Sequence, residues 1–314
     1  MSLVAVGACY VDTILTTPHY PGEDEKLRAA SISHRRGGNC PNTLEVLQQL
    51  TAHRSADASL DLVAVLPASA SAASQQIKSA LEPRVKLAHC IYREDFTEPA
   101  SSYIIKSQSS GSRTIVNYNE LPEMSVAEFT KIADDLGTRS SWFHFEGRIP
   151  DVILACIRYL RQKFPGVRVS VEAEKPARPG LQELAMEADV VFYSKSWAHA
   201  QGYQSAADCL RKQSELTHKA FLLCCTWGQD GAVALEPRSG NLVHSPAHTG
   251  PGFKVVDTIG AGDTFIAGML YSLIYRDADW DLSQKTAFAN RVAGMKVLQE
   301  GFSGLERALE LYPD

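Results

Sequence analysis

Two glycines and an aspartate stand close together in the segment Asp257–Phe265, which reads DTIGAGDTF and directly precedes an apolar run. The glycines let the backbone turn sharply, so that the amides of Gly260, Ala261 and Gly262 point toward one spot. At a helix start, unpaired amides and the helix dipole favour an anion such as phosphate. A carboxylate at Asp263 would repel that anion, but it suits a base that takes the proton of an attacking hydroxyl. Alternatively, Asp263 only caps the helix and the glycines only form the turn.

A second polar group lies near the start of the chain. Asn39 and Asn42, in the segment GGNCPN, each offer hydrogen-bond donors and acceptors, as a sugar hydroxyl requires. Gly38 lets the backbone approach a ligand closely, and Asp12 can accept bonds from two hydroxyls. These residue types predict a polyol site. Two structural alternatives stay open, namely a helix cap at Asn42 and a strand-end turn at Asp12.

Several basic side chains are candidates for contacts with phosphate. Arg113 follows a serine-rich turn between two β-like runs, and its guanidinium could bind a transferring phosphate with two hydrogen bonds. An exposed strand arginine is the alternative. Lys195 fits a nucleotide phosphate or a plain surface position equally well, and we expect Arg35 and Arg36 to be solvated. His144, among aromatic neighbours, is expected to be a hydrogen-bonded core residue.

Three ordered segments resemble the motifs of the ribokinase-like (PfkB) carbohydrate kinases: DTIGAGDTF, GGNCPN and the TWGQDG of residues Thr226–Gly231. They span nearly the whole chain. The resemblance implies an enzyme that transfers phosphate from ATP to a sugar hydroxyl, with Asp263 as the base. It also implies that the nucleotide is bound by the residues Thr226, Gly228, Gly231, Lys195 and Asn290.

The resemblance implies Mg²⁺ as a further cofactor. The family's usual N-x-x-E motif is absent near Ser194–Trp197, so the magnesium role is expected to fall to Glu172 or Glu174. Whether a monovalent cation such as K⁺ is also needed stays open.

Within the family, the segments Ser112–Val116, His144–Arg148 and Val171–Pro176 are most similar to members that phosphorylate ketohexoses such as fructose. Two alternatives stay open. One is another kinase of the family, acting on ribose, a ketodeoxy sugar acid or a nucleoside. The other is a non-catalytic protein that binds sugar or nucleotide on the same scaffold. The intact Asp263, Gly262 and Asn42 argue against the second alternative, because a protein without catalysis has no chemical need for the base.

The elements that must position these residues follow from the hydrophobic pattern. Strands alternate with helices between residues 140 and 226, which predicts a parallel sheet with helices on both faces. Two β-like regions, near 12–37 and 96–120, do not alternate with helices and predict a small separate sheet that acts as a lid. With the resemblance, we expect a single ribokinase-like α/β domain over residues 1–314, with a doubly wound, mostly parallel sheet and a β lid.

Composition excludes several classes of protein. Of the 314 residues, 45% are hydrophobic and 21% charged, which excludes disorder, collagen-like fibres and coiled coils. A net charge of -5 gives no basis for binding nucleic acid, and the most apolar segment, Phe265–Tyr275, is shorter than the ~20 residues that span a membrane. The seven cysteines include no C-x-x-C pair, so we expect reduced thiols in a cytoplasmic protein. The exposed edges of the lid predict a homodimer formed through it.

Overall fold

A nine-stranded sheet forms the centre of the molecule. The computed structural model describes residues 2–52, 59–248 and 254–311. The strand order is β15-β14-β13-β12-β11-β10-β1-β4-β6, parallel from β13 to β6, with β14 and β15 antiparallel at one edge. The strands are β1 (Ser2–Val6), β4 (Ser59–Val63), β6 (Val85–Lys86), β10 (Trp142–Glu146), β11 (Arg168–Ala173), β12 (Val190–Tyr193), β13 (Leu222–Thr226), β14 (Ala232–Glu236) and β15 (Asn241–Ser245).

Helices cover both faces of this sheet, because its strands are apolar on both sides. Leu3 and Ala5 of β1 belong to one core, while Val4 and Val6 belong to the other. The first core includes α1 (Asn39–Leu50), α2 (Ala72–Leu81), α8 (Ala261–Tyr275), α9 (Leu282–Val297) and the 3-10 helix Leu305–Leu311. The second includes α3 (Val126–Leu136), α4 (Pro150–Lys163), α5 (Leu181–Glu187), α6 (Lys195–Ala200) and α7 (Ala206–Ser214). Two further 3-10 turns span Gly137–Arg139 and Gly228–Asp230. The expected doubly wound, mostly parallel α/β architecture is confirmed.

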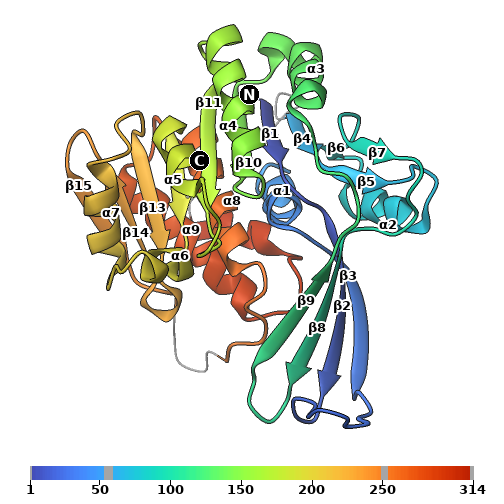
Figure 1. Ribbon diagram of the computed structural model, residues 1–314. Helices are drawn as coiled ribbons and strands as arrows, with labels where there is room; N and C mark the ends of the chain where they lie inside the picture. Colours follow the sequence, from blue (N-terminus) through green and yellow to red (C-terminus); the bar gives the residue numbers. More distant parts are fainter. Residues whose placement is uncertain (1, 53–58, 249–253, 312–314) are drawn as a thin grey trace.

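A separate four-stranded sheet projects from this body (Figure 1). We call it the small sheet; its order is β3 (Ser31–Gly37), β2 (Tyr10–Thr17), β8 (Ser101–Ser107) and β9 (Arg113–Tyr118). Both β-like regions expected near 12–37 and 96–120 therefore belong to one sheet. The parallel pairing of β2 with β8 joins the two regions, and the strands β2 and β3 and the strands β8 and β9 pair antiparallel.

One expected strand is in fact two. The run Asp61–Leu66 predicts a continuous strand, but β4 ends at Val63 and β5 (Val65–Pro67) leaves the main sheet to pair with β7 (Ile91–Arg93). The apolar side chains are buried on both sides of this break. Hydrophobic pattern alone therefore could not reveal where the chain changes sheets.

Candidate active site

A cleft of about 510 Å³ lies between the small sheet and the carboxyl ends of the parallel strands. Ligands bind at this edge in open α/β sheets, where neighbouring connections diverge to opposite sides. The connections diverge between β1 and β10, which are neighbours in the sheet. A hydrogen bond joins the ends of these two strands: the Ala8 amide, just after β1, donates to Glu146 Oε2 of β10 at 2.9 Å. The residues expected in the site that line this cleft are Asp12, Gly38, Asn39, Asn42, Arg113, Glu172, Glu174, Thr226, Gly260, Gly262 and Asp263.

The helix α8 begins at the cleft wall. Its N-cap Gly260 has φ of 79°, a conformation that favours glycine. A Cβ built on Gly262 would meet nothing within 4 Å, so a ligand can approach this part of the backbone closely. The amides of Gly260 and Gly262 have no acceptor among the described residues. The amide of Ala261 instead donates to the Thr258 carbonyl at 3.3 Å, so its expected contact with an anion competes with this turn bond.

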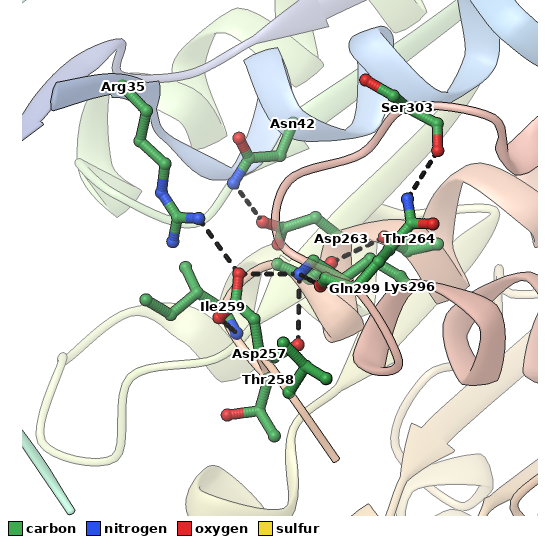
Figure 2. Close-up of polar contacts among 12 residues, drawn as sticks. Arg35, Asn42, Asp257, Thr258, Ile259, Asp263, Thr264, Lys296, Gln299 and Ser303 are labelled. Carbon is green, nitrogen blue, oxygen red and sulfur yellow. Dashed lines mark hydrogen bonds and ion pairs between the residues drawn. The ribbon is translucent and has the colours of Figure 1, made fainter. Parts of the chain in front are cut away.

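Asp263 lies in the first turn of α8 and points to Asn42, whose Nδ2 donates to Asp263 Oδ2 at 2.7 Å (Figure 2). Burial raises the pKa of Asp263 well above its usual range, and the negative charge of Glu172 raises it further, while the Asn42 bond opposes the rise. A carboxylate with a raised pKa is a stronger base. The site therefore holds a proton acceptor beside unpaired amides.

Arg36 orients Asn42, contrary to our expectation that this arginine is solvated. Its side chain is buried, Nη1 donates to Asn42 Oδ1 at 2.9 Å, and Nη2 pairs with Glu45. Because Oδ1 of Asn42 accepts this bond, its Nδ2 must face Asp263. Arg35 is bound as well, with Nη1 3.0 Å from Asp257 Oδ2. No sequence pattern indicated these partners, which come from α1 and from a segment more than 200 residues away.

Asp12 and Gly38 lie at the root of the small sheet. Burial raises the pKa of Asp12, whereas a hydrogen bond with Ser102 and the positive charge of Arg35 oppose that rise. A Cβ on Gly38 would lie 2.2 Å from the Ala8 carbonyl oxygen, and its φ of 105° is strained for other residues. Gly38 is therefore required for the chain to enter α1 beside the cleft.

Two acidic side chains approach each other at the end of β11. Asn39 Nδ2 donates both to Glu172 Oε2 at 2.7 Å and to Glu174 Oε2 at 2.9 Å. Burial raises the pKa of Glu172 to about 8, with Asn39 opposing the shift and Glu174 adding to it. Glu146, which no sequence motif indicated, faces the same cleft, and burial and the negative charge of Glu172 raise its pKa to about 7. Crowded carboxylate oxygens are the donor set that Mg²⁺ prefers, so the residues present fit this ion.

His144 is the core histidine that we expected. It is fully buried and hydrogen-bonded to Ser170 Oγ at 2.9 Å and to Glu172 Oε1 at 3.0 Å. Burial lowers the pKa of His144 to about 3, so the ring is neutral at physiological pH. Its effect on the site is indirect, through the orientation of Glu172.

Two arginines of the small sheet reach across to the start of α8. Arg113 Nη1 donates to Thr258 Oγ1 at 2.8 Å, and Arg35 binds Asp257, three residues before Gly260. Arg113 therefore lies where a guanidinium can act on an anion held at Gly260 and Gly262. Ser102 and Asn117 line the cleft from the same sheet. The segment Ala100–Ser102 departs from the family pattern in sequence, which pointed to the sugar pocket, whereas no sequence motif indicated Asn117. The alternation of side chains along β8 and β9 could have indicated that these two residues face the cleft, because every second side chain of a strand points to the same side.

The residues expected to hold the nucleotide are less closely grouped. Thr226 lines the cleft at the end of β13, whereas Lys195 Nζ lies 5.4 Å from the Trp227 ring centroid. Asn290 Nδ2 donates to the Ser245 carbonyl at 2.6 Å, and a Cβ on Gly231 would lie 2.1 Å from the same oxygen. Within the described ranges, Lys195, Gly228, Gly231, Asn290 and Ala261 do not line the cleft.

Comparison with known proteins shows which family the chain belongs to. Residues 1–307 match the pfkB family carbohydrate kinase domain. The chain belongs to the pfkB family of carbohydrate kinases. It is 35% identical to mouse ketohexokinase over 310 residues, which cover 96% of this chain and 98% of that protein. The pfkB family assignment makes the chain an ATP-dependent sugar kinase.

Solved structures agree on the fold. A ribokinase from Giardia lamblia superposes with a TM-score of 0.80 at 15% identity, covering 99% of both chains. A ribokinase from Arabidopsis thaliana, solved with ribose and ATP, superposes with a TM-score of 0.76 at 18% identity, covering 99% of this chain and 98% of that one. Among the described helices, none has the length and apolar character needed to cross a membrane.

Proposed function

We propose that this kinase phosphorylates a ketohexose, with fructose as the first candidate. The 35% identity to mouse ketohexokinase along almost the full chain supports this substrate class. The observation that carries the chemistry is the pairing of Asp263 with Asn42 at 2.7 Å beside the unpaired amides of Gly260 and Gly262. This pairing places a base next to an anion site, as transfer of a phosphoryl group to a hydroxyl requires.

Each candidate residue has a distinct part in this proposal. The sugar hydroxyls bind Asp12, Asn39, Asn42 and the backbone at Gly38, and Asp263 takes the proton of the attacking hydroxyl. The transferring phosphoryl group is stabilised by Arg113 and by the amides of residues 260–262. The remaining candidates hold the nucleotide: Thr226, Gly228, Gly231, Lys195 and Asn290.

The whole chain acts as one catalytic domain in this proposal, and the small sheet is its lid. The bonds from Arg35 and Arg113 to Asp257 and Thr258 support a lid that contacts the anion site. Closing over the sugar excludes water, which strengthens electrostatic contacts and suppresses hydrolysis of ATP.

Relative rates across sugars test the substrate. We expect kcat/KM for ADP release to be highest with fructose in a panel that includes tagatose, ribose, a nucleoside and ketodeoxygluconate. A higher value with ribose, the nucleoside or the sugar acid would favour the alternative family activities. Thermal stabilisation by sugar with nucleotide, without ADP release, would instead indicate a non-catalytic binding protein.

Glu172 and Glu174 are the proposed holders of Mg²⁺, which when bound neutralises charge on the phosphates. We expect Glu174→Gln to raise the Mg²⁺ concentration for half-maximal activity by about tenfold or more. Glu183→Gln, at an exposed glutamate of α5, is the matched control. An unchanged Mg²⁺ dependence in Glu174→Gln would remove that residue from the site. Assays in K⁺ and Na⁺ salts decide whether K⁺ is also required.

A homodimer through the small sheet is the proposed assembly. Ile104 and Ile115 line the cleft, so their neighbours Tyr103 and Val116 face the opposite side. The exposed fractions of Tyr103 and Val116 are 51% and 59%, and Ile32 on the same outer face is 59% exposed. Such an apolar face favours pairing with a second copy.

Val116→Asp tests this assembly, because a carboxylate buried in an apolar interface is strongly unfavourable. We expect the wild type to sediment as a dimer at micromolar concentration and Val116→Asp as a monomer. Met186→Asp, at an exposed apolar residue of α5, should stay dimeric. A monomeric wild type would rule out the proposed dimer.

A cytoplasmic location is proposed from the cysteines. All seven are buried and none forms a disulfide. Unpaired thiols are typical of proteins in a reducing compartment.

A further inference from the structure

Lys296 places a positive charge inside the protein, next to the segment that leads into α8. Its side chain is fully buried, with an exposed fraction of 0%. Nζ donates to Asp257 Oδ2 at 2.9 Å, to the Asp257 carbonyl oxygen at 3.1 Å and to the Gln299 carbonyl oxygen at 3.5 Å. Burying an ammonium is costly unless such oxygens replace its water. These three oxygens form a small binding pocket for a cation of one positive charge.

Asp257 connects this pocket to the anion site (Figure 2). Its Oδ2 also accepts from Arg35 Nη1 at 3.0 Å, and its Oδ1 accepts from the Ile259 amide at 2.9 Å. Ile259 directly precedes Gly260, so the position of the Asp257 carboxylate determines how the backbone enters the glycine turn. Without the ammonium, Oδ2 would lose one of its two cationic partners.

A second connection runs through Phe302. Lys296 Nζ lies 5.3 Å from the centroid of the Phe302 ring. A Cβ built on Gly260 would lie 2.4 Å from Phe302 Cζ, so the ring packs directly against this glycine. The amides of Val256 and Asp257 also donate to the Val297 carbonyl, at 2.8 and 3.2 Å. The end of α9 and the segment after it that holds Phe302 therefore both contact this loop.

We propose that the Lys296 ammonium acts as a tethered cation that holds the Thr258–Gly262 loop in the shape that binds the transferring phosphoryl group. Lys296 does not line the cleft in the part of the chain that the structure describes, so it is a positioning residue. The same oxygens would bind a free ammonium ion if the lysine side chain were removed. This inference rests on the phosphoryl transfer proposed above.

Lys285 offers a comparison on the same helix. It is also buried, and its Nζ donates to the Oδ1 and the carbonyl oxygen of Asp277, at 2.6 and 3.4 Å. These bonds join α9 only to the connection between α8 and α9, away from the cleft. If the buried lysines of α9 only stabilised the fold, substituting Lys285 or Lys296 by alanine should therefore affect the protein in the same way.

Chemical rescue of Lys296→Ala tests the proposal. With saturating sugar and ATP in choline chloride, we expect kcat at least about tenfold below that of the wild type, since small displacements of catalytic groups reduce rates strongly. Ammonium or methylammonium chloride at the same ionic strength should restore kcat saturably and raise the melting temperature of the variant. The response of the wild type to the same salts is the baseline. Lys285→Ala should show no response above that baseline.

Two outcomes would overturn the proposal: no rescue of Lys296→Ala above baseline, or equal rescue of Lys285→Ala. The melting measurement needs no catalysis, so it still tests the cation pocket if no sugar is phosphorylated. Should Lys296→Ala fail to fold, Lys296→Gln keeps a hydrogen-bond donor without the charge. A wild-type kcat in Lys296→Gln would equally overturn the proposal, and a lowered kcat with an unchanged sugar KM would support it.

Discussion

Asp263→Asn is expected to lower kcat at least about 100-fold, because asparagine keeps the shape of aspartate but takes no proton from the attacking hydroxyl. The fold and ATP binding should be preserved, and calorimetric titration with ATP checks this. In the wild type, activity should fall as pH decreases through the pKa of Asp263, since the base must be ionised. Burial and Glu172 raise that pKa, so this acidic limb should lie above the usual range of a carboxylate.

Asp61→Asn is the matched control for that experiment. Asp61 is a buried aspartate on β4 that accepts a bond from Ser59 and does not line the cleft within the described ranges. Turnover of Asp61→Asn should stay near that of the wild type. Wild-type turnover in Asp263→Asn would rule out Asp263 as the base.

Arg113→Ala is expected to lower kcat by about 100-fold, the typical loss for one electrostatic donor that stabilises a transition state. The guanidinium reaches from β9 to Thr258 Oγ1 at 2.8 Å, next to the amides of Gly260 and Gly262. There it can stabilise negative charge that develops on the phosphoryl group. Arg113→Lys keeps the positive charge but cannot bind the phosphoryl group with two parallel hydrogen bonds, so its kcat should lie between those of the wild type and Arg113→Ala.

Lys106→Ala controls for the general loss of a positive charge on the small sheet. Lys106 pairs with Arg113 across β8 and β9, and its Nζ lies 3.4 Å from the Val256 carbonyl oxygen. It does not line the cleft among the described residues. Equal losses of kcat in Lys106→Ala and Arg113→Ala would contradict a specific role for Arg113.

The architecture could be predicted because its signals are local. Strands and helices follow one another from β10 (Trp142–Glu146) to β13 (Leu222–Thr226), as the hydrophobic pattern between residues 140 and 226 predicts. The capping box of Ser125 and Glu128 determines where α3 begins. The two β regions of the small sheet were predicted by composition, but their pairing through β2 and β8 depends on contacts between distant residues.

The contacts within the candidate site could be predicted only in part. The glycines and Asp263 carry a strong local pattern. The partners that orient them do not, since Arg36 acts through Asn42 and Lys296 binds Asp257 from 39 residues away. Charged residues in a strand or helix are exposed by default, so their burial becomes apparent only from the three-dimensional structure.

ADP release in the presence of fructose, ATP and Mg²⁺ decides whether this chain phosphorylates a ketohexose with Asp263 as the base. We expect the wild type to form ADP and a fructose monophosphate in equal amounts, while Asp263→Asn forms almost none. Binding of fructose and ATP by the wild type without either product would rule out phosphorylation of fructose by this chain.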